Sequence, residues 1–327
     1  MLPECEACLR TVRKDRMKLT VYIPCYNAAR FIEASVRALL GQTRPPDEIL
    51  VIDDGSSDNS AELASQLPVR VIRHEKNKGL AAARNTAFAN ATHPFVGAID
   101  ADVLPGPTWL EHLLTHFADP RVAGTGGRLI EAHHSKPADA WRAIHMTQDL
   151  GLERIEIEHP SHKRLGGFGT IFRKEAVLSV GGYNENYRTN YEDVDLCTRL
   201  LAAGHKLIFE PRAVAFHQRR DSIQSVIRTS WHWDFCFHYF RGGYNRIWLK
   251  VLLNFRWARV LVWSHLRSRR FSLLLVDLPL PWVLSAMDLR YHFSSRRLPT
   301  VATSREQSAI YIPWPFRKLA RDRPRAS

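Results

Sequence analysis

The 327-residue chain is poor in cysteine, and no long apolar segment stands near its start. Five cysteines are too few, and odd in number, for a disulfide scaffold. Cys5 and Cys8 form a CxxC pair, but no second CxxC or Cys/His pair at zinc spacing accompanies it, which disfavours a zinc knuckle. No apolar h-region follows Met1, so we expect no secretory signal and a place in the reducing cytoplasm. Residues 1–17 are expected to form a loose leader.

Internal repeats and low-complexity tracts are also missing. A hydrophobic content of 45% and a charged content of 24% are ordinary for a globular protein and argue against wholesale disorder. At roughly 150 residues per domain, the length predicts two domains, or one large domain with an appendage.

Acidic residues become scarce in the last third of the chain. From Arg219 onward there are 20 basic residues and six acids, whereas the part before it holds 26 basic and 27 acidic residues. The net charge of +13 therefore belongs to the tail, which also carries seven of the nine tryptophans. Such a tail favours an acidic partner, either an anionic membrane surface or nucleic acid.

The segment between Leu19 and Glu131 alternates short apolar runs with helical patterns. Short linkers between such elements predict right-handed crossovers and a parallel sheet with helices on both faces, an α/β fold. The expected strands are Leu19–Pro24, Glu48–Asp54, Val69–His74 and Phe95–Asp100. The expected helices are Ala29–Leu40, Asn59–Leu67, Leu80–Asn90 and Trp109–Phe117.

Polar clusters stand at the carboxyl ends of these strands, where such sheets bind ligands. Asp53 and Asp54 follow the second strand, and Asp100 and Asp102 form a DxD after the fourth. Two carboxylates at this spacing are suited to a divalent cation. Read alone, a DxD more often marks a solvated strand end, and the small residues after Asp54 are suited to capping a helix.

Beyond Glu131 the pattern loosens. We expect a helix over Ala138–Leu150, and a glycine-rich turn, a short strand and a helix start over Gly166–Val177. A further helix is expected over Glu192–Ala203, followed by an extended pair over Leu207–His217.

Six ordered motifs give the chain a resemblance to family 2 glycosyltransferases over about Leu19–His217. They are IPCYN (Ile23–Asn27), VIDDGSSDNS, NKGLAAARN (Asn77–Asn85), IDADV (Ile99–Val103), GGFGTIFRKEAV with GGYNENY, and YEDVDLCTRLLAAGH (Tyr191–His205). The resemblance implies a GT-A fold, a nucleotide-diphosphate sugar as donor, a divalent metal (Mn or Mg) and inversion at the anomeric carbon.

The resemblance also implies roles for residues of the nucleotide half, 18–131. The turn from Pro24 to Tyr26, with Asp53 and Asp54, is expected to bind the base and ribose. Arg84 is expected near the nucleotide or its phosphates, and Asp100 near the ribose or metal-bound waters. Asp102 is expected to ligate the metal.

In the acceptor half, 132–217, the resemblance makes Asp193 the general base, with Glu192 beside it. The competing interpretation is compensation of the helix dipole by acids in a first turn. Gly166 and Gly167 are expected to let backbone approach the sugar or acceptor, although a plain turn explains them equally well.

His217 ends the last expected strand, where it could complete the metal sphere, touch a phosphate, or do neither. Arg219 and Arg220 follow it, either as a clamp for the diphosphate or as surface charge. The QxxRW-type signature and flanking membrane spans of processive relatives are missing, which favours transfer of one sugar per binding event.

The basic tail, residues 218–327, is interpreted as a helical extension that binds an anionic membrane surface. Ile247–Trp263 is interrupted by charges and is predicted to be interfacial. Phe271–Met287 contains Pro279 and Pro281, which favours a re-entrant or surface-lying helix pair over a span. Arginine clusters at Arg267–Arg270 and Arg296–Arg297 are expected to meet lipid headgroups. No nucleic-acid motif is visible, so we expect no nucleic-acid partner.

The sequence thus predicts a cytoplasmic inverting glycosyltransferase, peripheral on the inner face of the membrane. It is expected to move one sugar to a glycan or lipid-linked acceptor. The alternative is a membrane-associated scaffold that binds nucleotide sugar without catalysis.

Overall fold

A computed structural model describes residues 17–158, 164–187, 190–239 and 247–294. The expectations for the leader, for Cys5 and Cys8, and for Arg296–Arg297 lie outside these residues. The chain forms two compact units. Unit 1 comprises residues up to 132 together with 148–218, and unit 2 comprises residues 133–147 together with those from 219 onward.

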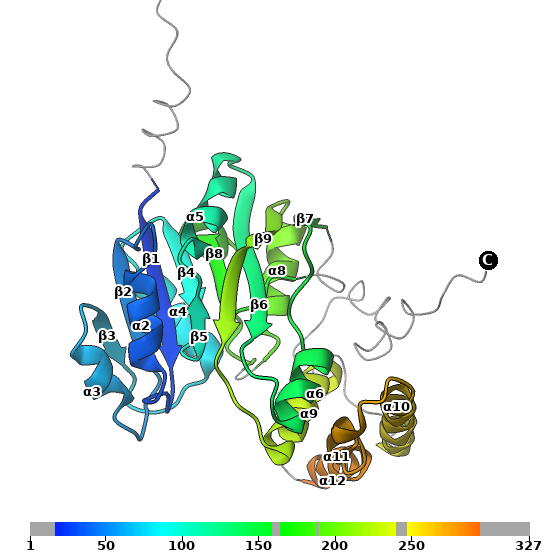
Figure 1. Ribbon diagram of the computed structural model, residues 1–327. Coiled ribbons are helices and arrows are strands. Elements are labelled where there is room, and N and C mark those ends of the chain that lie inside the picture. Colours follow the sequence, from blue (N-terminus) through cyan, green and yellow to red (C-terminus); the bar gives the residue numbers. More distant parts are fainter. Residues whose placement is uncertain (1–16, 159–163, 188–189, 240–246, 295–327) are drawn as a thin grey trace, which may run out of the picture. The chain divides into compact units, whose positions relative to one another are not determined.

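A mixed nine-stranded sheet is the centre of unit 1, with strand order β3-β2-β1-β4-β8-β6-β9-β5 and β7 paired to β9 (Figure 1). The strands are β1 (Leu19–Cys25), β2 (Glu48–Asp53), β3 (Arg70–Arg73), β4 (Phe95–Ile99), β5 (Val103–Pro105), β6 (Val122–Glu131), β7 (Ile155–Ile157), β8 (Gly169–Arg173) and β9 (Lys206–His217).

The first four strands pair in parallel, as expected, and β6 pairs in parallel with β9. Strand β8 runs antiparallel to both β4 and β6, so β4 and β6 point the same way. The carboxyl ends of β1, β2, β4, β6 and β9 therefore share one edge of the sheet.

Helices cover both faces of this sheet because its central strands are apolar on both sides. All seven residues of β1 are buried: Val21 and Ile23 pack on one face, and Tyr22 packs on the other. The first face is covered by α2 (Ile32–Leu40), α3 (Ser60–Ser65) and α5 (Trp109–Leu114), and η1 (Thr115–Ala118) follows α5. The second face is covered by α4 (Leu80–Asn90), α7 (Lys174–Ser179) and α8 (Glu192–Ala202).

The extended pair expected at Leu207–His217 is instead the single long strand β9. Its first part pairs with β6 up to Phe209, and pairing resumes at Val214 after a register shift. Pro211 lies in the irregular stretch, where its lack of an N–H breaks no ladder bond. The segment expected to be a pair is therefore one strand with an irregular stretch in its middle.

Unit 2 is helical. It consists of α6 (Pro137–His145), α9 (Ile223–Tyr239), α10 (Ile247–Arg267), η2 (Phe271–Leu273), α11 (Leu274–Asp277) and α12 (Leu280–Phe293). The helix expected over Ala138–Leu150 ends at His145, because Met146 leaves helical dihedrals and the chain returns to unit 1 at Gln148.

The interruption expected near Pro279 is only local, because Leu278 and Pro279 keep right-handed helical dihedrals. Within the described residues, Phe271–Phe293 is the one helical run, 23 residues in length, that is long and apolar enough to cross a membrane.

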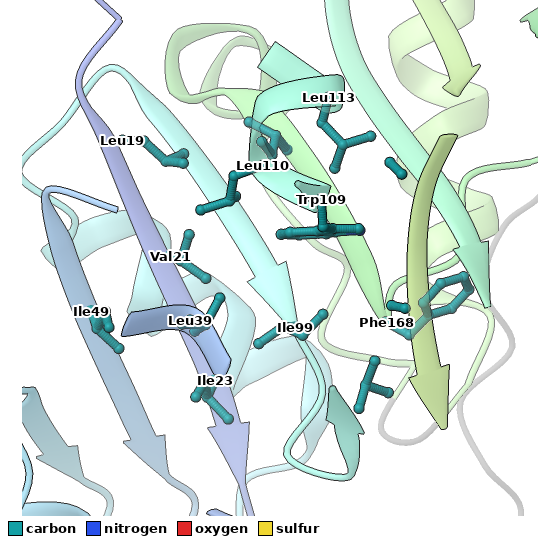
Figure 2. Packing of buried hydrophobic residues seen from close by; sticks show 14 of the residues in the cluster. Leu19, Val21, Ile23, Leu39, Ile49, Ile99, Trp109, Leu110, Leu113 and Phe168 are labelled. Atoms are coloured by element: carbon teal, nitrogen blue, oxygen red, sulfur yellow. The ribbon is translucent and has the colours of Figure 1, made fainter. Parts of the chain in front are cut away.

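Trp109 anchors the core on the first face of the sheet. Its ring is fully buried and packs among apolar side chains such as Leu110, Ile99 and Phe168 (Figure 2). We predict that Trp109→Ala lowers the free energy of unfolding by about 3–5 kcal/mol, through lost burial and the cavity left behind. Denaturant titration measures this loss.

The indole Nε1 of Trp109 has no hydrogen-bond partner among the described residues, so Trp109→Phe should cost much less. Leu152→Ala, at a side chain that is 77% exposed, serves as the control and should change stability by under about 0.5 kcal/mol. Equal losses for Trp109→Ala and Leu152→Ala would contradict this view of the core.

Candidate active site

The loops after β1 and β2 are fastened to each other at the carboxyl edge of the sheet. Asn27 has a left-handed φ of 51° and donates its backbone N–H to Ser56 Oγ at 3.0 Å. Its side-chain Oδ1 accepts the backbone N–H of Ser57 at 2.9 Å. Pro24 lies within β1, and the ring of Tyr26 is 53% exposed beside this loop pair. An exposed aromatic ring here offers a surface on which a flat ligand can stack.

The two aspartates that end β2 have different surroundings. Asp53 is fully buried, accepts the N–H of Ser56 at 3.3 Å, and lies 3.1 Å from Arg73 Nε. Its Oδ2 makes no aligned hydrogen bond among the described residues, although Arg73 is close, so this oxygen retains acceptor capacity.

Asp54 is engaged in holding the chain that leads into α4. Its oxygens accept the backbone N–H groups of Lys78 at 2.9 Å and Gly79 at 2.8 Å, and His74 Nδ1 lies 2.7 Å away. These contacts make Asp54 a positioning residue for α4, which carries Arg84.

Arg84 is a buried cation that brings several predicted residues together. Its side chain is 1% exposed. Nη2 lies 3.2 Å from Asp100 Oδ1, Nε lies 3.4 Å from Glu192 Oε1, and Nη1 donates to Tyr22 Oη at 3.2 Å. A buried guanidinium needs such compensation, because isolated charge is expensive in a low dielectric. The site is therefore assembled around Arg84.

The glycine pair before β8 fits tightly against this cluster. A Cβ on Gly167 would lie 2.6 Å from Arg84 Nη2, so a side chain there would displace the guanidinium. A Cβ on Gly166 would meet the Phe168 ring at 2.3 Å and Gln148 Oε1 at 2.7 Å. Both glycines are thus required for close packing at the site, whatever else they contact.

The two acids that open α8 differ in exposure. Glu192 is buried, and its Oε2 has no hydrogen-bond partner among the described residues. Burial and the neighbouring charge of Asp193 raise the pKa of Glu192 to about 7, although Arg84 acts in the opposite direction. Asp193 is 17% exposed, and its Oδ2 accepts the backbone N–H of Gly167 at 3.2 Å.

Asp195, in the same first turn, makes an i,i+4 ion pair with Arg199 at 2.6 Å. Only Asp193 of the three acids is therefore both partly exposed and directed to the glycine turn. Tyr191, which precedes α8, has a left-handed φ of 80°, an unusual conformation for a bulky residue that is typical of functional sites.

Asp102 and His217 meet at the ends of β4 and β9. His217 Nε2 lies 3.2 Å from Asp102 Oδ2, and its Nδ1 lies 3.0 Å from Glu131 Oε2. Burial alone would lower the pKa of His217, but the hydrogen bonds with Asp102 and Glu131 raise it to about 9. Asp100, beside them, has a raised pKa because of burial and the charge of Asp102, opposed by Arg84.

Asp102, His217 and Glu131 therefore form a chain of two ion pairs. A carboxylate and an imidazole nitrogen face each other, and the second imidazole nitrogen is held by a carboxylate, as is usual for metal-binding histidines. No group of three or more His, Cys, Asp or Glu suited to a metal occurs in the described ranges. Further ligands would have to come from water and substrate phosphates, which is how Mg²⁺ is commonly held.

Two contributors to the site were not anticipated from the sequence. Glu131 ends β6 and is brought to His217 by the β6–β9 pairing, across 86 positions of sequence. Tyr22 was expected only as part of a buried strand. Arg219 belongs to unit 2, where its guanidinium binds Asp221 at 3.0 Å.

The fold and the edge cluster together define a class of protein. A largely parallel sheet with acids at its carboxyl edge, including a DxD after β4, is the arrangement of GT-A nucleotide-sugar transferases. Residues 20–180 match the family model described as Glycosyl transferase family 2, and this segment of the chain belongs to that family.

Curated relatives agree with this family. A pre-mycofactocin glycosyltransferase of Mycobacterium tuberculosis is 35% identical over 214 residues, which are 64% of this chain and 44% of that protein. A poly-beta-1,6-N-acetyl-D-glucosamine synthase of Staphylococcus aureus is 26% identical over 221 residues, 66% of this chain and 53% of that protein. The chain spans about half the length of these relatives.

Solved structures share the fold. A mannosyltransferase from Pyrobaculum calidifontis, in complex with GDP-Man and Mn²⁺, has a TM-score of 0.52 at 21% identity and covers 87% of this chain and 77% of that one. GalNAc-T7 with UDP, GalNAc and Mn²⁺ has a TM-score of 0.53 at 17% identity, over 66% of this chain and 48% of that one. At these identities the likeness concerns the fold alone.

The raised pKa of Glu192 predicts a pH-dependent stability. A carboxyl whose pKa is about 7 in the folded chain, against an ordinary 4.5, retains its proton longer when folded. The free energy of unfolding should therefore decrease as the pH rises from 4.5 to 7. The Glu192→Gln variant has no carboxyl to titrate there and should lack this decrease. Denaturant titrations of both proteins across this range measure the difference, and a difference independent of pH would contradict the prediction.

Proposed function

We propose that this protein is a metal-dependent inverting glycosyltransferase that moves one sugar from a nucleotide-diphosphate donor to an acceptor hydroxyl. The observation that carries the proposal is the convergence of Arg84, Asp102, Asp193 and His217 on Asp100 at the β4 end. The family supports the reaction class, and the nucleotides and Mn²⁺ in the two solved structures support the donor and metal.

The loops after β1 and β2 would hold the nucleoside. Asp53, whose Oδ2 retains acceptor capacity, is suited to bind base or ribose groups, with Pro24 and Tyr26 beside it. Asp54 would act indirectly, by anchoring the chain before α4. Arg84 would contribute positive charge near the phosphates while keeping Asp100 and Glu192 in place.

Asp102 and His217 would hold the divalent cation, Mn or Mg, and the cation would displace the proton on His217 Nε2. When bound, such a cation supplies Lewis-acid stabilisation of the charge that develops on a diphosphate leaving group. Glu131 would keep the His217 ring oriented so that Nε2 is presented toward the metal.

Asp193 would act as general base. As the acceptor oxygen bonds to the anomeric carbon, the bond to the nucleoside diphosphate breaks and the hydroxyl proton passes to the Asp193 carboxylate. Such a base contributes roughly 10²–10⁴-fold to rate. Glu192, buried against Arg84, would position the guanidinium, and the turn at Gly166 and Gly167 would border the acceptor.

The acceptor proposed is a hydroxyl of a lipid-linked or cell-surface glycan precursor, with one sugar added per binding event. A glycan synthase is among the relatives, which supports a glycan acceptor. The basic tail is proposed to keep the enzyme on the anionic inner face of the membrane, in the cytoplasm. The alternative, a scaffold that binds nucleotide sugar without catalysis, differs only in the outcome of the second test below.

Asp102→Asn should remove most of the metal dependence of nucleotide binding. Calorimetry with UDP and with GDP, each with and without MnCl₂, measures this directly and needs no turnover. The nucleotide that binds the wild type should bind Asp102→Asn at least about tenfold more weakly when Mn²⁺ is present. The Glu131→Gln variant should lose about 10–100-fold in metal affinity, because the His217 ring is no longer held in place. Asp119→Asn, at a surface pair with Arg121, is the control. Unchanged Mn²⁺ dependence in Asp102→Asn would refute the metal assignment.

Asp193→Asn should abolish transfer, by roughly 10²–10⁴-fold in kcat, while leaving nucleotide affinity near that of wild type. A screen of nucleotide-diphosphate sugars for hydrolysis first identifies the donor, and the variant is then assayed with it. Asp195→Asn, two residues away and paired with Arg199, should keep its activity. A wild type that binds nucleotide but neither hydrolyses nor transfers any sugar would favour the scaffold.

A further inference from the structure

The helices of unit 2 bury polar side chains alongside apolar ones, and they expose large apolar side chains. On α10, the buried side chains include Lys250, Asn254 and His265, whereas Trp248 and Leu252 are 68% and 66% exposed. On α12, Ser285 and Asp288 are buried while Trp282 is 68% exposed. In a water-soluble helix the apolar side faces inward, so this arrangement needs a different explanation.

The polar side chains inside unit 2 are paired with one another. Asp277 accepts the indole N–H of Trp141 at 2.8 Å and lies 2.5 Å from His265 Nδ1. Asp288 accepts N–H groups from Trp231 and from Asn254, both at 2.9 Å. Most of the polar interior is therefore paired, although Asp139 Oδ2 and Trp257 Nε1 have no hydrogen-bond partner among the described residues. Paired groups of this kind hold the helices together, and the apolar residues are exposed on these packed helices.

The exposed apolar residues of the run from Phe271 to Phe293 form a stripe that is densest between Phe271 and Trp282. Its five most exposed side chains recur at helical spacing and are 56–73% exposed: Phe271, Leu275, Leu278, Trp282 and Phe293. From Phe271 to Trp282 there are 11 steps, which is about 17 Å of helix. Arg290 is exposed between Trp282 and Phe293, and the uncharged patch before it marks an interaction site.

Charges nearby indicate how deep the contact goes. Arg269 and Arg270 directly precede the stripe, and Arg256 and Arg259 are exposed at the middle of α10. An arginine at the centre of a bilayer costs roughly 2.5–3.5 kcal/mol, so full immersion of unit 2 is disfavoured. Arginines beside an apolar, tryptophan-bearing face instead fit the headgroup layer of a single leaflet.

We infer that unit 2 is a monotopic membrane element, in which this stripe lies in the acyl region of one leaflet, parallel to its plane. The inference refines the membrane attachment proposed above, because it makes hydrocarbon contact, and not attraction to anionic lipid, the main source of binding. A second copy of the chain is the competing occupant. The flanking arginines oppose it, since pairing two such faces would bring like charges together.

The inference predicts salt-resistant binding to uncharged membranes. In flotation assays, the full-length protein should float with pure phosphatidylcholine vesicles even at about 1 M NaCl, where electrostatic attraction is screened within ~3 Å. Leu275→Glu/Leu278→Glu should reduce the partition coefficient by at least about tenfold, because two leucines lose their burial in lipid. Arg269→Gln/Arg270→Gln should weaken only the added binding that phosphatidylserine gives at low salt.

The matched control places the same substitutions on unit 1. Leu152 and Leu178 are exposed leucines there, at 77% and 51%, and Leu152→Glu/Leu178→Glu should float like the wild type. Nucleotide calorimetry on all variants separates a failure of this inference from a failure of the donor site. A wild type that is released by salt, or that floats only with phosphatidylserine, would overturn hydrocarbon insertion.

A second measurement does not depend on a charged substitution. Trp282 fluorescence, isolated as the difference between wild type and Trp282→Phe, should be quenched by phosphatidylcholine brominated on its acyl chains. Absence of that quenching would overturn the inference. A dimer seen by sedimentation without lipid would also overturn the inference, if Leu275→Glu/Leu278→Glu converted that dimer to a monomer and left flotation unchanged.

Discussion

A single buried guanidinium organises the candidate active site. Arg84 enters the interior from α4 and can remain charged there only because Asp100, Glu192 and the Tyr22 hydroxyl surround it. These partners come from β4, α8 and β1, so the cost of burying one cation fixes the relative positions of three elements. The glycine at 167 follows from the same constraint, since any side chain there would occupy the place of the guanidinium.

The two units differ in where their polar side chains lie. In unit 1, apolar strands are covered by helices, and the acids of the candidate site lie at the carboxyl edge of the sheet, where substrates bind in such folds. In unit 2, aspartates, histidine and asparagine are gathered inside and apolar rings point outward. The same physical rule, that buried polar groups must be paired, shapes the candidate active-site edge of one unit and the partly polar interior of the other.

Local patterns predicted the first half of the fold well, because buried parallel strands are near-continuous apolar runs that end in polar residues. The strand ends at Asp53 and Asp100 were located within a residue. Long-range pairing was beyond reach: nothing near Glu131 in the sequence indicates that it meets His217. The burial of Asp277 and Asp288 could not be predicted either, since sequence does not show which face of a helix is inside.

The chain passes between the units three times, after residues 132, 147 and 218. Helix α6 therefore lies within the sequence range of the family domain but packs with the tail, through the Trp141–Asp277 bond and the contact between Asp221 N–H and Asp139. A chimera that exchanges only the tail would leave α6 facing a foreign surface. The segment 133–147 and the tail have to be inherited, or swapped, as one pair.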